Sequence, residues 1–273
     1  MSYDLAIMAK RAGDKRSSIT LAAIYPTKAL SQDLAKIYMR AVKAWRDATQ
    51  VFILPAYSRS LAGLTADAMM TDDVPGIEAS IARAEAQTNA VIAAISIDLE
   101  SWEQSTEKWH ADKFAAAVAA GTAIDVTLLI SSEAVADALK AFLAENVNLI
   151  SSVSQETKAR IAGIVWRGYL ARTPRREMAK QINKALGMSR DRALRIASDQ
   201  TVKLSAKLDE MRQTEAGFDK FKWVHSGKLR FRPEHKARDG KIYEWGKGVA
   251  KSDPPGFAPF CGCKAAPVLE LEE

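Results

Sequence analysis

The stretch IEASIARAEAQTNAVIAAISIDLESW, residues 77–102, decides the fold class of this chain. It is rich in alanine and contains neither glycine nor proline. Alanine has the highest helix propensity, and glycine and proline are the residues that interrupt helices. The stretch therefore predicts a long helix, and Trp109 and Phe114 continue its helical pattern toward Gly121.

Flanking stretches extend the helical prediction. Apolar residues recur at helical spacing in SQDLAKIYMRAVKAWRDATQ (31–50), a helix expected to be broken by Pro55, and in SSEAVADALKAFLAENVNLISSV (131–153). GLTADAMMTDDVPG (63–76) predicts a turn. SSITLAAIYP (17–26) has β-branched residues before a proline and predicts an extended N-terminal arm or an edge strand.

A helix pair is expected over residues 173–215. Thr173 and Pro174 form a helix start, Gly187 fits a left-handed helix end, and Ser189 fits the cap of a second helix. Two helices joined by a glycine turn, the second rich in arginine, are also typical of a helix-turn-helix DNA-binding protein. The second helix is far longer than a recognition helix and carries an apolar stripe, which favours a packed pair of core helices.

The C-terminal residues change to strand patterns. FDKFKWVHSG (218–227), KIYEW (241–245) and CGCKAAPVL (261–269) predict three strands, with a turn at Asp239–Gly240 and a loop rich in glycine and proline between the last two. We therefore expect a mainly α protein: a multi-helix body with a small C-terminal α+β unit, made of a long helix and a short antiparallel sheet.

Charge divides the chain near residue 150. Residues 1–150 hold 14 Lys and Arg against 18 Asp and Glu, a net charge of −4, whereas residues 151–273 hold 25 against 15, a net charge of +10. The prediction is a helical N-terminal region (1–150) and a basic domain (151–273). A basic domain suits DNA or an acidic protein surface as a partner, although a solvated Lys and Arg face gives the same composition.

The composition argues against secretion and membrane insertion. The first residues lack the apolar core of a secretory signal, and the most apolar stretch, FAAAVAAGTAI (114–124), is too short to span a bilayer. The chain has 2 cysteines, separated by one glycine, so no disulfide framework is expected. We therefore expect a cytosolic protein without a membrane partner.

Cys261, Cys263 and His235 are candidate zinc ligands, with His225 or Asp239 as a fourth, because zinc favours four sulfur, nitrogen or oxygen donors. The alternative is that the two cysteines point to one face of a strand and pack as small apolar groups. The sequence favours packing, so no metal or other cofactor is predicted, and zinc stays the alternative.

An enzyme would use His235 as a general base or as a metal ligand of a nuclease, with Arg230 and Arg232 holding phosphate. The sequence offers no second histidine or carboxylate cluster beside them, so no catalytic residue is predicted. The arginines are instead expected to bind backbone carbonyls in a turn-rich fold.

The C-terminal residues also form an ordered motif: a tryptophan, R-x-R-x-x-H-x-x-x-D-G, an aromatic strand, a Pro-Pro loop, and C-x-C followed by a proline. The residues of this motif are Trp223, Arg230, Arg232, His235, Asp239, Gly240, Trp245, Pro254, Pro255, Cys261, Cys263 and Pro267. The motif resembles the phage Mu F-like minor head protein family, also called phage head morphogenesis proteins. The resemblance covers about residues 140–270 and departs from the family at Lys228, often acidic there, and at Gly262, often arginine.

The resemblance implies a non-enzymatic minor capsid protein of a tailed phage or prophage. Such a protein acts in procapsid assembly and head morphogenesis, with the portal protein and other head proteins as partners and packaged DNA as a further contact. It is expected in the virion head or procapsid, and in the host cytoplasm during assembly. The alternative function is a helix-turn-helix DNA-binding protein or a metal-dependent nuclease.

Overall fold

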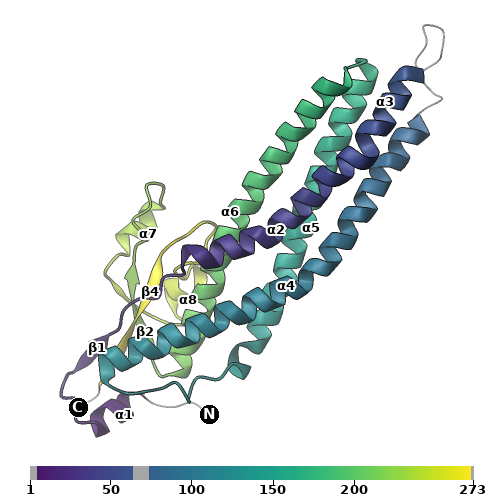
Figure 1. Cartoon of the computed structure of the whole chain (residues 1–273). Helices are drawn as coiled ribbons and strands as arrows, with labels where there is room; N and C mark the ends of the chain where they lie inside the picture. The colour runs from purple at the N-terminus through teal and green to yellow at the C-terminus, as the bar shows by residue number, and fades with distance from the viewer. Residues whose placement is uncertain (1–4, 64–73, 272–273) are drawn as a thin grey trace. The chain divides into compact units, whose positions relative to one another are not determined.

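The computed structural model describes residues 5–63 and 74–271 and is mainly helical, with a small four-stranded sheet (Figure 1). The elements are α1 (Leu5–Arg11), β1 (Ser18–Thr20), α2 (Lys28–Ala48), the π-helical turn η1 (Thr49–Ile53), α3 (Leu54–Gly63), α4 (Val74–Thr122), the 3-10 turn η2 (Glu133–Val135), α5 (Ala136–Leu170), α6 (Arg175–Glu215), β2 (Lys220–Val224), α7 (Pro233–Ala237), β3 (Ile242–Glu244), α8 (Gly248–Ser252) and β4 (Lys264–Glu270).

Contacts group the chain into two compact units. The helical unit comprises Gln32–Glu100 and Leu143–Ala197, and the sheet unit comprises Met1–Ser31, Ser101–Phe142 and Ser198–Glu273. Each unit draws residues from both halves of the sequence. This grouping follows contacts in space, and the boundary near residue 150 suggested by charge stays a prediction.

The predicted long helix over 77–102 is confirmed within α4, which also contains Trp109 and Phe114. The predicted helix end at Pro55 is wrong. A π-helical turn, η1, joins α2 to α3, and the amide of Leu54 donates to the carbonyl of Thr49. Pro55 follows this turn within a continuous run of helical residues, and the π-helical turn accommodates the missing amide hydrogen of proline. Residues 64–73 of the predicted turn lie outside the described residues.

The predicted helix break at Gly187 is also wrong, because α6 runs without interruption from Arg175 to Glu215. Ser189 caps no helix. It is buried, accepts a hydrogen bond from Thr157 (Oγ1 to Oγ, 2.7 Å) and donates one to the carbonyl of Ala185. The helix-turn-helix alternative is therefore wrong for this segment, because a helix-turn-helix needs two helices and residues 175–215 form a single continuous one.

Buried aromatic side chains connect the helices of the helical unit. Trp45 of α2 donates from Nε1 to Ser154 Oγ of α5 (2.8 Å), and Tyr38 donates from its hydroxyl to Asn146 Oδ1 (2.9 Å). A shift of α2 along α5 would leave these buried polar groups without partners, which costs free energy. Each bond therefore also fixes which residues of α2 and α5 face each other.

The sheet has the strand order β1-β4-β2-β3 and is antiparallel throughout. The predicted edge strand near the N-terminus is confirmed as β1, with Ile19 opposite Leu269 of β4. Strand β2 lies between β4 and β3, and Phe221 is opposite both Pro267 and Tyr243. The three predicted C-terminal strands are confirmed, but β4 begins at Lys264, so the two cysteines precede the strand instead of lying in it.

Two apolar clusters support the sheet. The first joins α1, β1, the end of α4 and the end of β4, with Leu5, Ile19, Phe114 and Leu269 almost fully buried. The second lies under β2 and contains Phe221, Trp223, Trp245, Ala250, Cys261, Cys263 and Ala265. The second cluster contains both cysteines and therefore places them in the interior of the sheet unit.

Candidate functional site

His235 lies on the short helix α7, between the strands β2 and β3. Arg232 precedes the helix in an extended conformation, and Pro233 occupies its first turn, a position that suits the fixed φ of proline. The short helix turns the His235 side chain inward, so that only 2% of the residue is exposed. The imidazole ring packs edge-on against Trp223 of β2, with ring centroids 5.2 Å apart.

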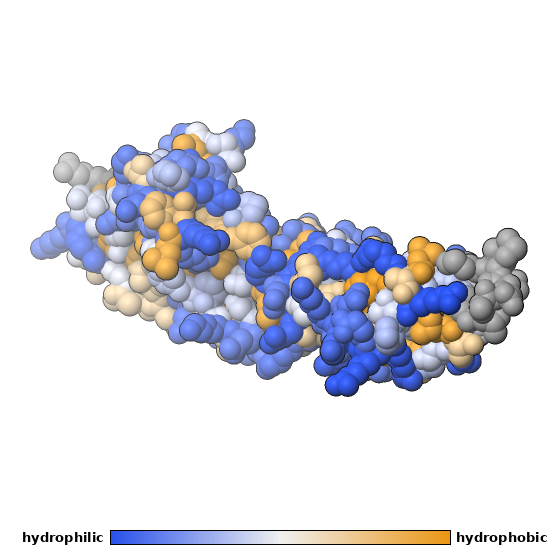
Figure 2. Space-filling model, turned by 90° about the horizontal axis from the view of Figure 1, so that it is seen from above, coloured by the Kyte–Doolittle hydropathy of each residue, from blue (hydrophilic) through white to orange (hydrophobic). Residues whose placement is uncertain are grey.

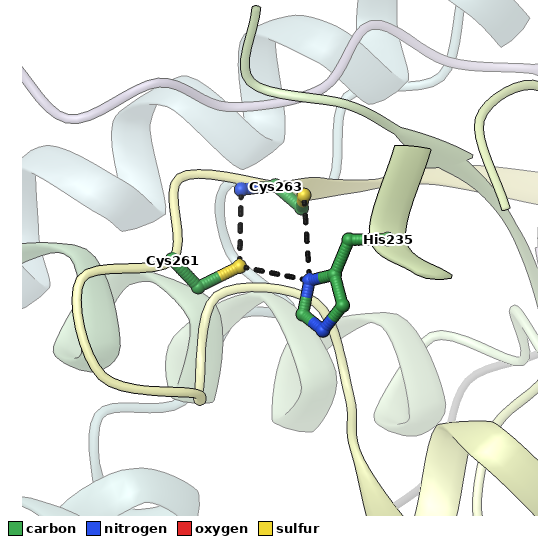
Figure 3. Close-up of side chains that lie close together, drawn as sticks. All are labelled: His235, Cys261 and Cys263. Atoms are coloured by element: carbon green, nitrogen blue, oxygen red, sulfur yellow. Dashed lines mark hydrogen bonds between the residues drawn. The ribbon is translucent and has the colours of Figure 1, made fainter. Parts of the chain in front are cut away.

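Cys261 and Cys263 approach His235 from the loop before β4 (Figure 3). His235 Nδ1 lies 3.4 Å from Cys261 Sγ and 3.8 Å from Cys263 Sγ. Both thiols are buried and form no disulfide. The expected position of the cysteines on one face of a strand is wrong, because β4 begins at Lys264. The loop before β4 instead turns both side chains toward the same imidazole, within the second apolar cluster.

Asp253 binds the opposite side of the His235 ring. Its Oδ2 lies 2.9 Å from His235 Nε2 and also accepts a hydrogen bond of 2.7 Å from Arg238. Burial alone would raise the pKa of Asp253. The hydrogen bonds with Arg238 and His235, together with the positive charge beside the carboxylate, instead lower this pKa below its ordinary value. When the ring is neutral with its hydrogen on Nε2, facing the ionised Asp253, the Nδ1 lone pair is directed at the sulfurs.

The two thiols differ in acidity. The pKa of Cys261 is lowered to about 5, mainly by the hydrogen bond from the Cys263 thiol. Burial opposes this change, and the backbone amides of Cys263 and Gly256 and the side chain of His235 add to it. The same thiol–thiol bond and burial raise the pKa of Cys263. Cys261 is therefore the thiol that this environment favours as a thiolate.

Other motif residues hold the backbone around this group. The amide of Gly240, which has a φ of +75°, donates to the carbonyl of Trp223, and Asp239 Oδ1 accepts the amide of His225 (2.8 Å). Arg232 donates to the carbonyl of Pro259 (3.2 Å), as expected for an arginine that holds a loop.

Four motif residues have other surroundings: Arg230, Trp245, Pro254 and Pro255. Arg230 is exposed on the surface, whereas Trp245 is buried and donates from Nε1 to Gln213 Oε1 of α6. Pro254 and Pro255 follow Asp253 directly in the loop before β4, and Pro255 is buried.

Sequence reasoning missed Asp253 as the partner of His235. It considered His225 and Asp239 instead, and neither belongs to the close group. The two residues of the pair are 18 positions apart, and only the fold brings them together. An aspartate directly before Pro254–Pro255 was the available signal.

A second buried polar group was also missed. His110 of α4 lies between Asp209 and Arg212 of α6, with Nε2 3.1 Å from Asp209 Oδ1 and Nδ1 2.6 Å from the guanidinium. Arg212 also forms an ion pair with Glu107. Burial lowers the pKa of His110, so the neutral ring is favoured at this position. Glu107 and His110 lie three residues apart on one helix face, which was the signal in the sequence.

The geometry suits binding of one soft metal ion more than acid–base catalysis. Among the described residues, one group of three or more His, Cys, Asp or Glu side chains has all its donor atoms within 4.8 Å of one another. This group is His235, Cys261 and Cys263. A cavity of about 20 Å³ adjoins all three and is also lined by Lys228, Arg230 and Arg232. Such a cavity has room for about one water molecule, which is too little for an organic substrate.

Comparison with known proteins agrees with the motif. Residues 165–266 match the family model described as "Phage Mu protein F like protein". A Haemophilus influenzae protein (strain ATCC 51907 / DSM 11121 / KW20 / Rd), described as "Uncharacterized protein", is 31% identical over 153 residues, 56% of this chain and 34% of that protein.

The chain thus spans about a third of the length of this curated relative. No solved structure matches the chain significantly. The part of the chain that matches the family model contains Trp223, the R-x-R-x-x-H motif and both cysteines. The resemblance to the phage Mu F-like family is therefore confirmed over residues 165–266.

Proposed function

We propose that the chain is a minor head protein of a tailed phage or prophage that acts in head morphogenesis at or near the portal. The observation that carries the proposal is the family match over residues 165–266, together with the ordered motif that the fold gathers in the sheet unit. The proposal assigns no catalytic step. It places the protein in the procapsid or virion head, and in the host cytoplasm during assembly.

The surface suited to a partner is the α7 loop, which we define as residues 225–241 between β2 and β3. This loop holds six Lys and Arg against two Asp and Glu, a net charge of +4. It also exposes Leu229 (99%) and Phe231 (45%) among these charges. Exposed apolar side chains inside a basic surface favour a partner that combines acidic and apolar groups, as the portal or another head protein would.

Figure 2 shows a largely hydrophilic face on which hydrophobic residues form separate patches. Within the described ranges, no helix is long and apolar enough to cross a membrane. Packaged DNA is the second contact that the basic loop would suit, because phosphate contacts depend on Lys and Arg.

The test is incorporation into heads. The chain, produced together with the portal and head proteins of the same prophage, is expected in purified procapsids and in pull-downs with the portal. Arg230→Glu with Lys236→Glu reverses two exposed charges of the α7 loop and should lower incorporation at least tenfold. Arg176→Glu with Lys184→Glu, a matched pair on the exposed surface of α6, should not lower it.

Absence of the unaltered chain from procapsids would overturn the proposal, most clearly if the chain bound one short DNA sequence tightly at physiological salt. Direct DNA contact is tested by duplex binding as the salt concentration rises. Non-specific phosphate contacts weaken steeply with salt, whereas binding through the apolar side chains of the loop does not.

A further inference from the structure

His235, Cys261 and Cys263 have the donor chemistry of a zinc site. Two sulfurs and one imidazole nitrogen form the set, and each residue is at most 5% exposed. Thiolate and imidazole are the ligands that zinc prefers in proteins, and combinations of cysteine and histidine dominate its sites. The three residues come from α7 and from the loop before β4, so a shared ion would fasten two separate segments of the sheet unit.

The distances already fit such an ion. Bonds of about 2.3 Å from zinc to sulfur and about 2.0 Å to nitrogen, at tetrahedral angles, place the ligand atoms roughly 3.5 to 3.8 Å apart. His235 Nδ1 lies 3.4 Å from one sulfur and 3.8 Å from the other. Both nitrogen–sulfur distances are therefore close to those of a bound ion, and all three donor atoms lie within 4.8 Å of one another.

The surroundings of His235 match those of a metal-bound histidine. A histidine that binds zinc through one nitrogen usually donates from the other to a carboxylate, which fixes its tautomer. Asp253 takes this place, 2.9 Å from Nε2, and Arg238 in turn holds Asp253. Packing of two small thiols alone requires neither the histidine nor its contact with the partly exposed carboxylate of Asp253.

The backbone and the adjoining cavity complete the arrangement. The amide of Cys263 points at Cys261 Sγ at 3.5 Å, the kind of contact that stabilises a thiolate. The cavity of about 20 Å³ next to the three side chains has room for about one water molecule, which would fill a fourth coordination position.

We propose that His235, Cys261 and Cys263 bind one zinc ion, with a water molecule as the fourth ligand, and that the ion fastens α7 to the loop before β4. In this proposal the ion holds the base of the α7 loop. The site does not depend on the proposed function, because the ligands and the carboxylate that orients them belong to the sheet unit alone.

The first experiment measures metal in the full chain, purified under reducing conditions and with any affinity tag removed. We expect about one zinc per chain by elemental analysis. Replacement of zinc by cobalt(II) should produce the charge-transfer absorption of a thiolate–cobalt bond. A stoichiometry near zero without such a band after cobalt addition, or a disulfide between Cys261 and Cys263 under the same conditions, would overturn the proposal.

Substitutions test the ligand set. Cys261→Ala, Cys263→Ala and His235→Ala should each lower the zinc content at least tenfold. His225→Ala is the matched control, because its ring lines the same cavity but lies outside the close group, and it should keep zinc at the level of the unaltered chain. Full zinc content in both cysteine variants, or its loss in His225→Ala as well, would refute this ligand set.

A measurement on the unaltered chain covers the case in which a variant fails to fold. Removal of zinc with a chelator should lower the midpoint of thermal unfolding, and one equivalent of zinc should restore it. An identical midpoint with and without chelator would show that the group only packs, and the proposal would be abandoned.

Discussion

Replacement of Gly187 by alanine distinguishes a continuous α6 from two helices joined by a turn. Gly187 lies inside α6, is exposed, and has no atom within 4 Å of the position that a Cβ would occupy. Alanine in a helix interior is favoured over glycine by roughly 0.5–1 kcal/mol. With no neighbour to displace, the full gain should appear in the free energy of unfolding.

A left-handed glycine at a helix end predicts the opposite sign. Alanine in that conformation costs about 1–2 kcal/mol, because its Cβ approaches the following carbonyl. The two structures therefore differ by about 2 kcal/mol in the expected effect of the Gly187→Ala substitution, which exceeds the error of a urea unfolding experiment.

The assay is urea unfolding followed by far-ultraviolet circular dichroism, with thermal unfolding as a second measurement. We expect a higher urea midpoint, an unchanged m-value and a thermal midpoint raised by about 1–3 °C. Gly256→Ala is the control, because Gly256 has a φ of +89° and its Cβ would lie 2.6 Å from that of Ala206; a loss of about 1–3 kcal/mol is expected. A loss of about 1 kcal/mol or more in Gly187→Ala would refute the continuous helix.

Three further substitutions test the interior and surface. Burial lowers the pKa of His110 from its ordinary 6.5, so near that pH the unfolded chain binds a proton that the folded chain does not. The free energy of unfolding should therefore fall as the pH drops below about 7. His110→Gln should reduce this slope in unfolding experiments between about pH 5 and about pH 8. Equal slopes would contradict this reasoning. Trp45→Phe removes the buried hydrogen bond to Ser154 and should cost about 1–2 kcal/mol or more by urea unfolding. The cost should be smaller by about 1 kcal/mol in a Ser154→Ala background, where that bond is already absent. Leu229→Ser, at a residue that is 99% exposed, should change the free energy of unfolding by less than about 0.5 kcal/mol in the same assay; a larger loss would show that the loop tip is packed.

The elements that the sequence predicted best are those set by local chemistry. Residues 77–102 form a helix because no glycine or proline interrupts them, and β2 alternates buried Phe221 and Trp223 with exposed Lys222. The predictions failed at Pro55 and Gly187, where a breaking residue was expected to end a helix. A π-helical turn accommodates the first, and the second lies on the exposed side of a helix held by its neighbours on the other side.

The candidate site shows a similar limit. Cysteine and histidine identities were enough to name His235, Cys261 and Cys263, because few side chains in the chain offer such donors. The role of Asp253 depends on how the loop after α8 returns to α7, which no local pattern specifies. The contact with Trp223 likewise depends on the position of β2 beside α7.

The α7 loop connects the two proposals, since its base is where the metal would bind and its tip is the surface offered to a partner. The loop buries few side chains apart from His235, so polar contacts help to hold it, among them Arg238 to Asp253, Arg232 to Pro259 and Lys228 to Phe260. The proposed ion would add to these contacts. Removal of zinc should therefore speed amide hydrogen exchange in residues 233–241, while exchange in the interior of α5 stays unchanged. Unchanged exchange in the loop would show that the polar contacts hold it without the ion, and a partner would then meet the same surface with or without the metal.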